Sequence, residues 1–166
     1  MKHLMKIFSM VMALSVVLSC CVFSAGAVEM DEEETDEIEV FYLDDNIKVT
    51  VIPKSAVAGT LALQAGTTSN GTASPYAYPS YKCRSGNGSH CRVTIDNTDD
   101  SASMKATIDY TIPDGSVNTT YTIHAGDGKI ILVENTSGAD LTCTISVTIK
   151  AYRATSVDYS FSAYQY

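Results

Sequence analysis

Cysteine is the residue type in this sequence whose spacing most directly implies chemistry. Five cysteines are present, and two of them, Cys83 and Cys91, flank a glycine-rich stretch, residues 84–90. A three-residue turn over residues 86–88 would set these two cysteines opposite each other in a hairpin. We therefore expect a Cys83–Cys91 disulfide, worth roughly 2 to 3 kcal/mol through loop closure, with Cys143 left as a buried thiol. The alternative is a bridge from Cys91 to Cys143 that joins two sheets.

Three tyrosines, Tyr76, Tyr78 and Tyr81, form the clearest candidate binding group. They follow one another closely at the end of a stretch, residues 67–80, that is rich in Gly, Ser, Thr, Pro and Tyr and is predicted to be a loop. Exposed tyrosine rings stack on sugars or anchor a protein partner. The alternative is that the three rings fold down and cap the open end of a sandwich.

A second candidate site is the oxygen-rich turn Asp96-Asn97-Thr98-Asp99-Asp100. Carboxylate oxygens are the ligands that Ca²⁺ prefers, so Asp96, Asp99 and Asp100 are candidate calcium ligands. The spacing does not follow the EF-hand pattern, and Asp and Asn are also ordinary turn residues. Calcium is the one cofactor that the sequence brings into consideration.

Catalytic motifs are missing from the sequence. Beyond residue 27 the histidines are His90 and His124, and no Cys-x-x-Cys, His-Glu-x-x-His or Gly-x-Ser-x-Gly pattern occurs. A nucleophilic cysteine needs an exposed, electropositive setting, which an alternating apolar pattern around Cys91 and Cys143 does not favour. The sequence therefore predicts a protein that is not an enzyme.

Residues 1–27 have the three parts of a secretory signal. Lys2 and Lys6 precede an apolar run over residues 7–23, and Ala25-Gly26-Ala27 supplies the small residues of a cleavage site. We expect a secreted protein that begins at Val28 and has no membrane span after cleavage. The alternative is a lipid anchor on Cys20, although leucine occupies the slot that usually holds a small residue in a lipoprotein box.

The charge of the chain is concentrated near its amino end. The formal net charge is −8, and ten of the nineteen acidic residues lie between Glu29 and Asp45. Self-repulsion keeps such a run solvated, so residues 28–37 are predicted to be an acidic disordered segment. From Asn46 onward acids and bases balance, which leaves no basic footprint for nucleic acid.

The remaining residues, 38–166, alternate apolar and polar side chains in the manner of strands with one wet face. The pattern is clearest over Met104–Ile112 and Leu141–Ala151, and Asp114-Gly115 indicates a tight hairpin turn that sets Ile112 opposite Val117. Short, regularly spaced strands predict an all-β domain, an antiparallel β-sandwich of about eight strands and of immunoglobulin-like or jelly-roll type.

These observations favour a secreted, non-enzymatic binding or interaction module. Its expected partner is an extracellular glycan or a protein surface on a cell. The alternative from another class is a structural protein that associates with its own copies through exposed sheet edges.

Overall fold

The computed structural model describes residues 37–57 and 66–166. The predicted signal sequence, Cys20 and nearly all of the acidic segment lie outside these residues. No helix within the described part is long and apolar enough to cross a membrane.

In chain order the elements are β1 (Glu39–Tyr42), β2 (Ile47–Pro53), a 3₁₀ turn η1 (Lys54–Ala56), β3 (Thr67–Ala73), β4 (Tyr76–Ala77), β5 (Ser80–Lys82), β6 (His90–Asn97), β7 (Ser103–Ile112), β8 (Gly115–Ile123), β9 (Gly128–Asn135), β10 (Thr144–Tyr152) and β11 (Val157–Gln165).

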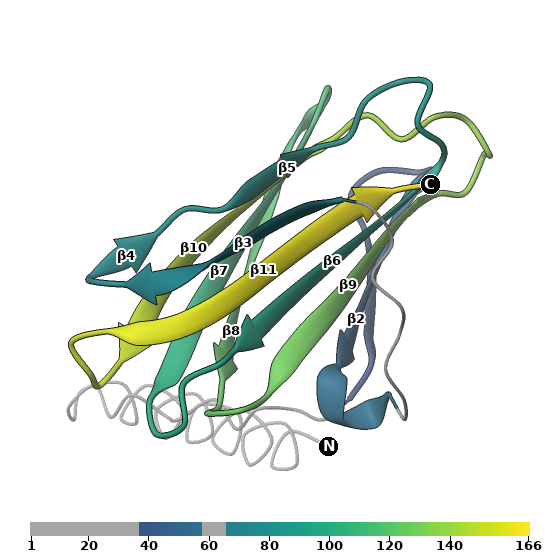
Figure 1. Ribbon diagram of the computed structural model, residues 1–166. Coiled ribbons are helices and arrows are strands. Elements are labelled where there is room, and N and C mark those ends of the chain that lie inside the picture. The colour runs from purple at the N-terminus through teal and green to yellow at the C-terminus, as the bar shows by residue number, and fades with distance from the viewer. Residues whose placement is uncertain (1–36, 58–65) are drawn as a thin grey trace, which may run out of the picture. The chain divides into compact units, whose positions relative to one another are not determined.

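The strands form two antiparallel sheets that face each other (Figure 1). The first sheet has the order β1-β2-β9-β6-β11-β3, and the second has the order β4-β10-β7-β8, with β5 also paired to β10. Alternate residues of each strand point into the space between the sheets, as the period of two requires. Strand β7, for example, buries Met104, Ala106, Ile108 and Tyr110, one after another. The predicted all-β sandwich is confirmed.

The pairing is that of a jelly roll. Strands β4 and β5 keep the same register along β10, so they are one strand interrupted between them. Counted this way, the chain from β3 to β11 has eight strands, and the first pairs with the last, the second with the seventh, the third with the sixth and the fourth with the fifth. This nested pairing is the double Greek key of a jelly roll and decides between the two sandwich types. The β1–β2 hairpin extends the first sheet beyond β9.

The sequence-based count of about eight strands was wrong, because residues 37–57 and 66–166 alone form eleven. Residues 67–80, predicted to be a loop, contain β3, β4 and the start of β5. Strand β3 is an edge strand and exposes most of its side chains on both faces, so its sequence, TTSNGTA, has no alternation to detect.

The register of the β7–β8 hairpin also differs from the predicted one. Ile112 lies opposite Gly115, and the two-residue turn is Pro113-Asp114 rather than Asp114-Gly115. The prediction placed Ile112 opposite Val117, two residues further along. A slip by two residues keeps every side chain on its face, so apolar patterning alone cannot distinguish the two registers. Proline presets the backbone for the first turn position, which accounts for the observed choice.

Candidate functional site

The interrupted strand β4–β5 forms one edge of the second sheet and carries all three candidate tyrosines. Period two sends Tyr76 and Tyr78 to the outer face, while Tyr81 points inward opposite Ile145 of β10. Pro79, between the two segments, is buried, and its carbonyl accepts a hydrogen bond from the Val147 N–H at 2.9 Å. The edge therefore presents its tyrosines on two different sides.

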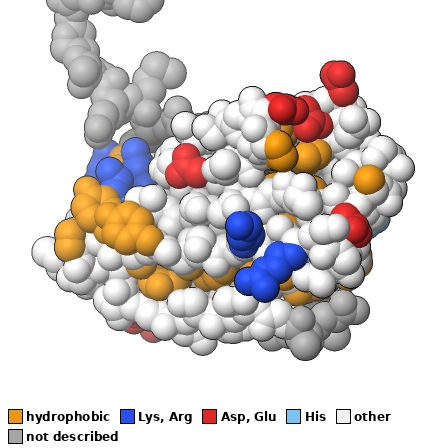
Figure 2. Space-filling model, turned by 90° about the horizontal axis from the view of Figure 1, so that it is seen from above, with side chains coloured by type: hydrophobic (Ala, Val, Ile, Leu, Met, Phe, Trp, Pro, Cys, Tyr) orange, Lys and Arg blue, Asp and Glu red, His pale blue; other side chains and the backbone are white. Residues whose placement is uncertain are grey.

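The outward pair forms an exposed aromatic platform. The rings of Tyr76 and Tyr78 stack with centroids 6.2 Å apart and an interplanar angle of 24°. Tyr76 is 48% exposed and Tyr78 is 70% exposed, so the rings do not fold down over the core. Viewed from above, hydrophobic side chains gather on the side where Figure 1 shows β4, with Lys and Arg side chains beside them (Figure 2).

Basic side chains neighbour this platform on the outer face of the second sheet. Lys150 lies directly opposite Tyr76, and Lys105 lies opposite Lys150 on the next strand. The Lys105 ammonium sits 4.7 Å from the centre of the Tyr152 ring, and the Arg153 guanidinium sits 4.9 Å from it. These are cation–π distances, so the aromatic and cationic groups here form one surface.

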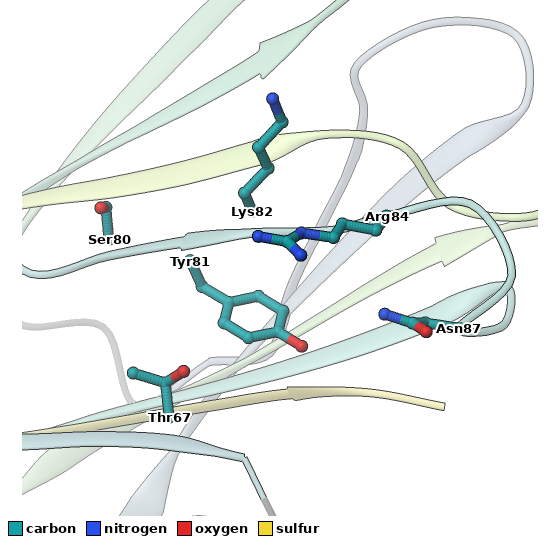
Figure 3. Close-up of a pocket in the computed structure, with 6 residues that line it drawn as sticks. All are labelled: Thr67, Ser80, Tyr81, Lys82, Arg84 and Asn87. Carbon is teal, nitrogen blue, oxygen red and sulfur yellow. The ribbon is translucent and has the colours of Figure 1, made fainter.

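Tyr81 lines a separate open depression of about 310 Å³. Figure 3 shows the Tyr81 ring pointing into it, the Arg84 side chain reaching back over that ring, and the Lys82 side chain directed away. Partial burial raises the pKa of the Tyr81 phenol, which therefore stays protonated and can donate a hydrogen bond. The lining residues are Thr67, Ser80, Tyr81, Lys82, Arg84 and Asn87.

Two side chains from distant parts of the chain hold the loop that carries Arg84. The Gln165 amide oxygen accepts a hydrogen bond from the Arg84 N–H at 2.8 Å, and its NH₂ group donates to the Arg84 carbonyl at 3.0 Å. The same NH₂ group lies 2.8 Å from the Gly88 carbonyl and 2.9 Å from the Leu141 carbonyl. Asp140 accepts from the Gly86 N–H at 2.8 Å and from a nearby serine hydroxyl, and the backbone N–H contact lowers the pKa of its carboxyl.

The three cysteines converge at one end of the core, although not in the predicted hairpin. Cys83 follows β5, and its N–H donates to the Cys143 carbonyl at 2.8 Å, whereas Cys91 lies on β6 in the other sheet. Residues 84–90 thus connect the two sheets, which overturns the hairpin that was the basis for the predicted disulfide. All three are free and buried, so the structure does not show a Cys83–Cys91 bond. Hydrogen bonding to Cys83 together with burial raises the pKa of Cys91 and of Cys143.

The aspartates of the predicted calcium turn are engaged separately. Asp96 pairs with the Lys54 ammonium at 3.1 Å. The Asp99 carboxylate accepts from the Ala102 and Ser101 N–H groups, which lowers its pKa. Asp100 is exposed. Over residues 37–57 and 66–166 the structure brings no three carboxylate, histidine or cysteine side chains together in a way that could hold a metal ion.

No protein-family model, curated protein or solved structure matches this chain. The jelly roll by itself supports many unrelated activities, so function has to be argued from the tyrosine edge and its surroundings.

Sequence reasoning found the tyrosines and missed the polar residues that surround Tyr81. Arg84 entered only as part of the stretch between two cysteines, and neither Lys82 nor Gln165 was singled out at all. Gln165 contacts Arg84 across 81 residues of sequence. No local pattern signals such a contact, because β5 and β11 come together only once the jelly roll closes. The one available signal was a pair of basic residues, Lys82 and Arg84, in a stretch that has no acid.

Proposed function

We propose that this chain is a secreted, non-enzymatic module that binds extracellular glycan through the β4–β5 edge. The observation that carries the proposal is the stacked, exposed pair Tyr76 and Tyr78. Two large rings held side by side in water leave apolar surface uncovered, and such patches commonly mark an interaction site. Pyranose rings have an apolar face and a polar rim, and tyrosine combines an aromatic face with a hydroxyl in a similar way.

The outer face of the second sheet supports the same target. Next to the tyrosines, β10 and β7 present outward rows of hydroxyl groups, with Ser146, Thr148 and Thr107 among them. A flat face with many hydroxyls and few acids suits the hydroxyl groups of a polysaccharide. The predicted export of the chain would bring it to where such polymers occur. A face with these properties in the described residues supports binding of a polysaccharide rather than cleavage of its bonds.

The experiment is retention on immobilised polysaccharides by affinity electrophoresis, with the exported chain and a Tyr76→Ala/Tyr78→Ala double variant. Stacking of one aromatic on a ligand ring contributes on the order of 1 kcal/mol, so losing two should weaken binding roughly 10-fold or more. Tyr42→Ala is the matched control, because Tyr42 is 59% exposed but lies on β1 of the other sheet. Equal retention of the double variant and the parent, or no retention on any polysaccharide, would contradict the proposal.

A second candidate, self-association, is favoured by one observation on the opposite edge. Val40 and Tyr42 of β1, together with Ile38 just before it, alternate along the chain, and each is more than half exposed. In the described residues β1 pairs with β2 alone, so its other backbone edge is open to a second copy of the chain. Light scattering across a dilution series should then show a concentration-dependent mass that Val40→Lys abolishes. A single monomeric mass at every concentration would exclude this candidate.

A further inference from the structure

We propose that the depression beside Tyr81 binds the carboxylate of an acidic sugar, with Arg84 as the anion-binding residue and Gln165 as the positioning residue. This inference rests on the proposed function, and it narrows the target from glycans in general to uronic-acid glycans.

The charge of the depression is one-sided. Its lining contains Lys82 and Arg84 and no acidic residue. In the part of the chain that the structure describes, the ion pairs are Lys54–Asp96 and His90–Glu134, so neither lining base is neutralised by a carboxylate. The neighbouring outer face adds Lys105 and Lys150, and Asp109 is the one acid in the outward row of β7. An anionic ligand would gain favourable interactions here that a neutral ligand would not.

The loop under Arg84 is held in place before any ligand arrives. Both backbone polar groups of Arg84 are bonded to the Gln165 amide, at 2.8 and 3.0 Å. Asp140 fixes the next turn of the loop through Gly86. Within the described residues, the Arg84 guanidinium forms no hydrogen bond or ion pair with the rest of the protein. A fixed backbone with an uncommitted guanidinium lowers the ordering cost of binding, which is what a recognition residue requires.

The geometry favours one carboxylate over a phosphate. Only the Arg84 guanidinium reaches over the Tyr81 ring, while the Lys82 ammonium points away (Figure 3). A single planar guanidinium forms two parallel hydrogen bonds with a carboxylate. A phosphate dianion would leave more charge uncompensated by this one group. Thr67, Ser80 and Asn87 offer hydrogen-bonding groups for the sugar hydroxyls around the ring.

The test is an NMR titration of the isotope-labelled, exported chain with D-galacturonate and, separately, with D-galactose. Galacturonate carries a carboxylate at the position where galactose carries a hydroxymethyl group. Galacturonate should shift the backbone amides of residues 81–88, and galactose should bind at least 10-fold more weakly. Arg84→Gln should weaken galacturonate about 10-fold or more and leave galactose unchanged. Arg84→Lys should keep only part of the galacturonate affinity, because lysine supplies the positive charge but not the planar guanidinium that forms two parallel hydrogen bonds. Lys48→Gln, on β2 of the other sheet, is the charge-matched control and should change neither.

Gln165 has its own readout. Gln165→Leu should weaken galacturonate while galactose binding, which does not use the guanidinium, keeps its affinity. If Gln165 had only a structural role, Gln165→Leu would weaken the binding of both sugars equally. The inference is overturned if the two sugars bind alike, if inorganic phosphate shifts the same amides at lower concentration than galacturonate, or if Arg84→Gln has no effect. None of these results bears on the proposed function itself. That function is tested separately, by whether the Tyr76→Ala/Tyr78→Ala variant loses retention on neutral polysaccharide.

Discussion

Gln165 is the side chain whose removal tests most of the reasoning about the β5 edge. Its amide joins three segments, since its oxygen accepts from the Arg84 N–H and the two hydrogens of its NH₂ group are shared among the Arg84, Gly88 and Leu141 carbonyls. Gln165→Leu keeps similar volume and removes all four interactions.

The cost follows from the number and the setting of these bonds. A typical hydrogen bond contributes about 0.5 to 1.5 kcal/mol net, and water can replace part of it here because two of the four bonds are exposed. We therefore expect Gln165→Leu to lower the free energy of unfolding by about 2 to 3 kcal/mol. For a folded unit of about 130 residues this corresponds to a fall of roughly 7 to 11 °C in Tm.

The assay combines thermal unfolding with hydrogen exchange. Exchange should accelerate at the amides of Arg84, Asn87 and Leu141, whose protection depends on this junction, and stay unchanged in the middle of β7. Thr120→Val is the control, because it removes one exposed hydroxyl contact of 2.9 Å to Thr107 and should change stability by less than about 0.5 kcal/mol. If Gln165→Leu melts within about 1 °C of the parent and exchanges like it, the amide does not hold the loop and the argument for a preorganised Arg84 fails.

Three further predictions concern other parts of the domain. Asn97 is buried, and its NH₂ group donates to the Ala102 and Ile123 carbonyls at 2.8 and 3.0 Å, so Asn97→Leu should cost about 2 to 4 kcal/mol in chemical denaturation; a loss below about 0.5 kcal/mol would contradict this. The pKa of Asp140 is lowered in the folded state, so its carboxylate stabilises the fold above its unfolded-state pKa, and this stabilisation is lost as pH falls through the folded-state pKa. Asp140→Asn should therefore melt lower than the parent at pH 7, and the gap should close in acid; a gap independent of pH would be the opposite result. Cys83, Cys91 and Cys143 are free and buried, so a thiol reagent should label none of them in the folded protein and all three after unfolding without a reducing agent; fewer than three labelled thiols in the unfolded, unreduced protein would instead reveal a disulfide.

Most of the fold could be predicted because it depends on local alternation. The strands predicted over residues 104–112 and 141–151 are present as β7 and β10, although β10 begins only at Thr144, and each of them buries every second side chain against the opposite sheet. Strands β1 and β2 also follow from local signals, because apolar residues lie on both sides of Asp44-Asp45 and the Asp44 carboxylate accepts from the Asn46 and Ile47 N–H groups in the turn between the two strands. Burial on one face and turn chemistry both depend on residues that are close together in the sequence.

What could not be predicted depends on contacts between distant segments. Strand β3 has little buried surface of its own and is held by backbone pairing to β11, so its side chains carry no alternating signal. Cys83 and Cys91 are eight positions apart and belong to different sheets, because the chain crosses the sandwich between β5 and β6. Two residues that are near in sequence suggested a hairpin, and only the jelly-roll topology separates them.

The same alternation that was visible elsewhere explains why the candidate site has two parts. Along the β4–β5 edge, Tyr76 and Tyr78 are separated by an even number of positions and share the outer face, whereas Tyr81 is separated from Tyr78 by an odd number and turns inward. Three tyrosines in six positions therefore make a flat outer platform and one wall of a depression rather than a single cluster. A polymer is the kind of ligand that such an edge suits, because one sugar can stack on the platform while another, further along the polymer, turns its charged group toward Arg84. A small ligand would engage one part and gain nothing from the other, so the separate responses of the Tyr76→Ala/Tyr78→Ala and Arg84→Gln variants to a long acidic polysaccharide should multiply, whereas monomeric galacturonate should respond to Arg84→Gln alone.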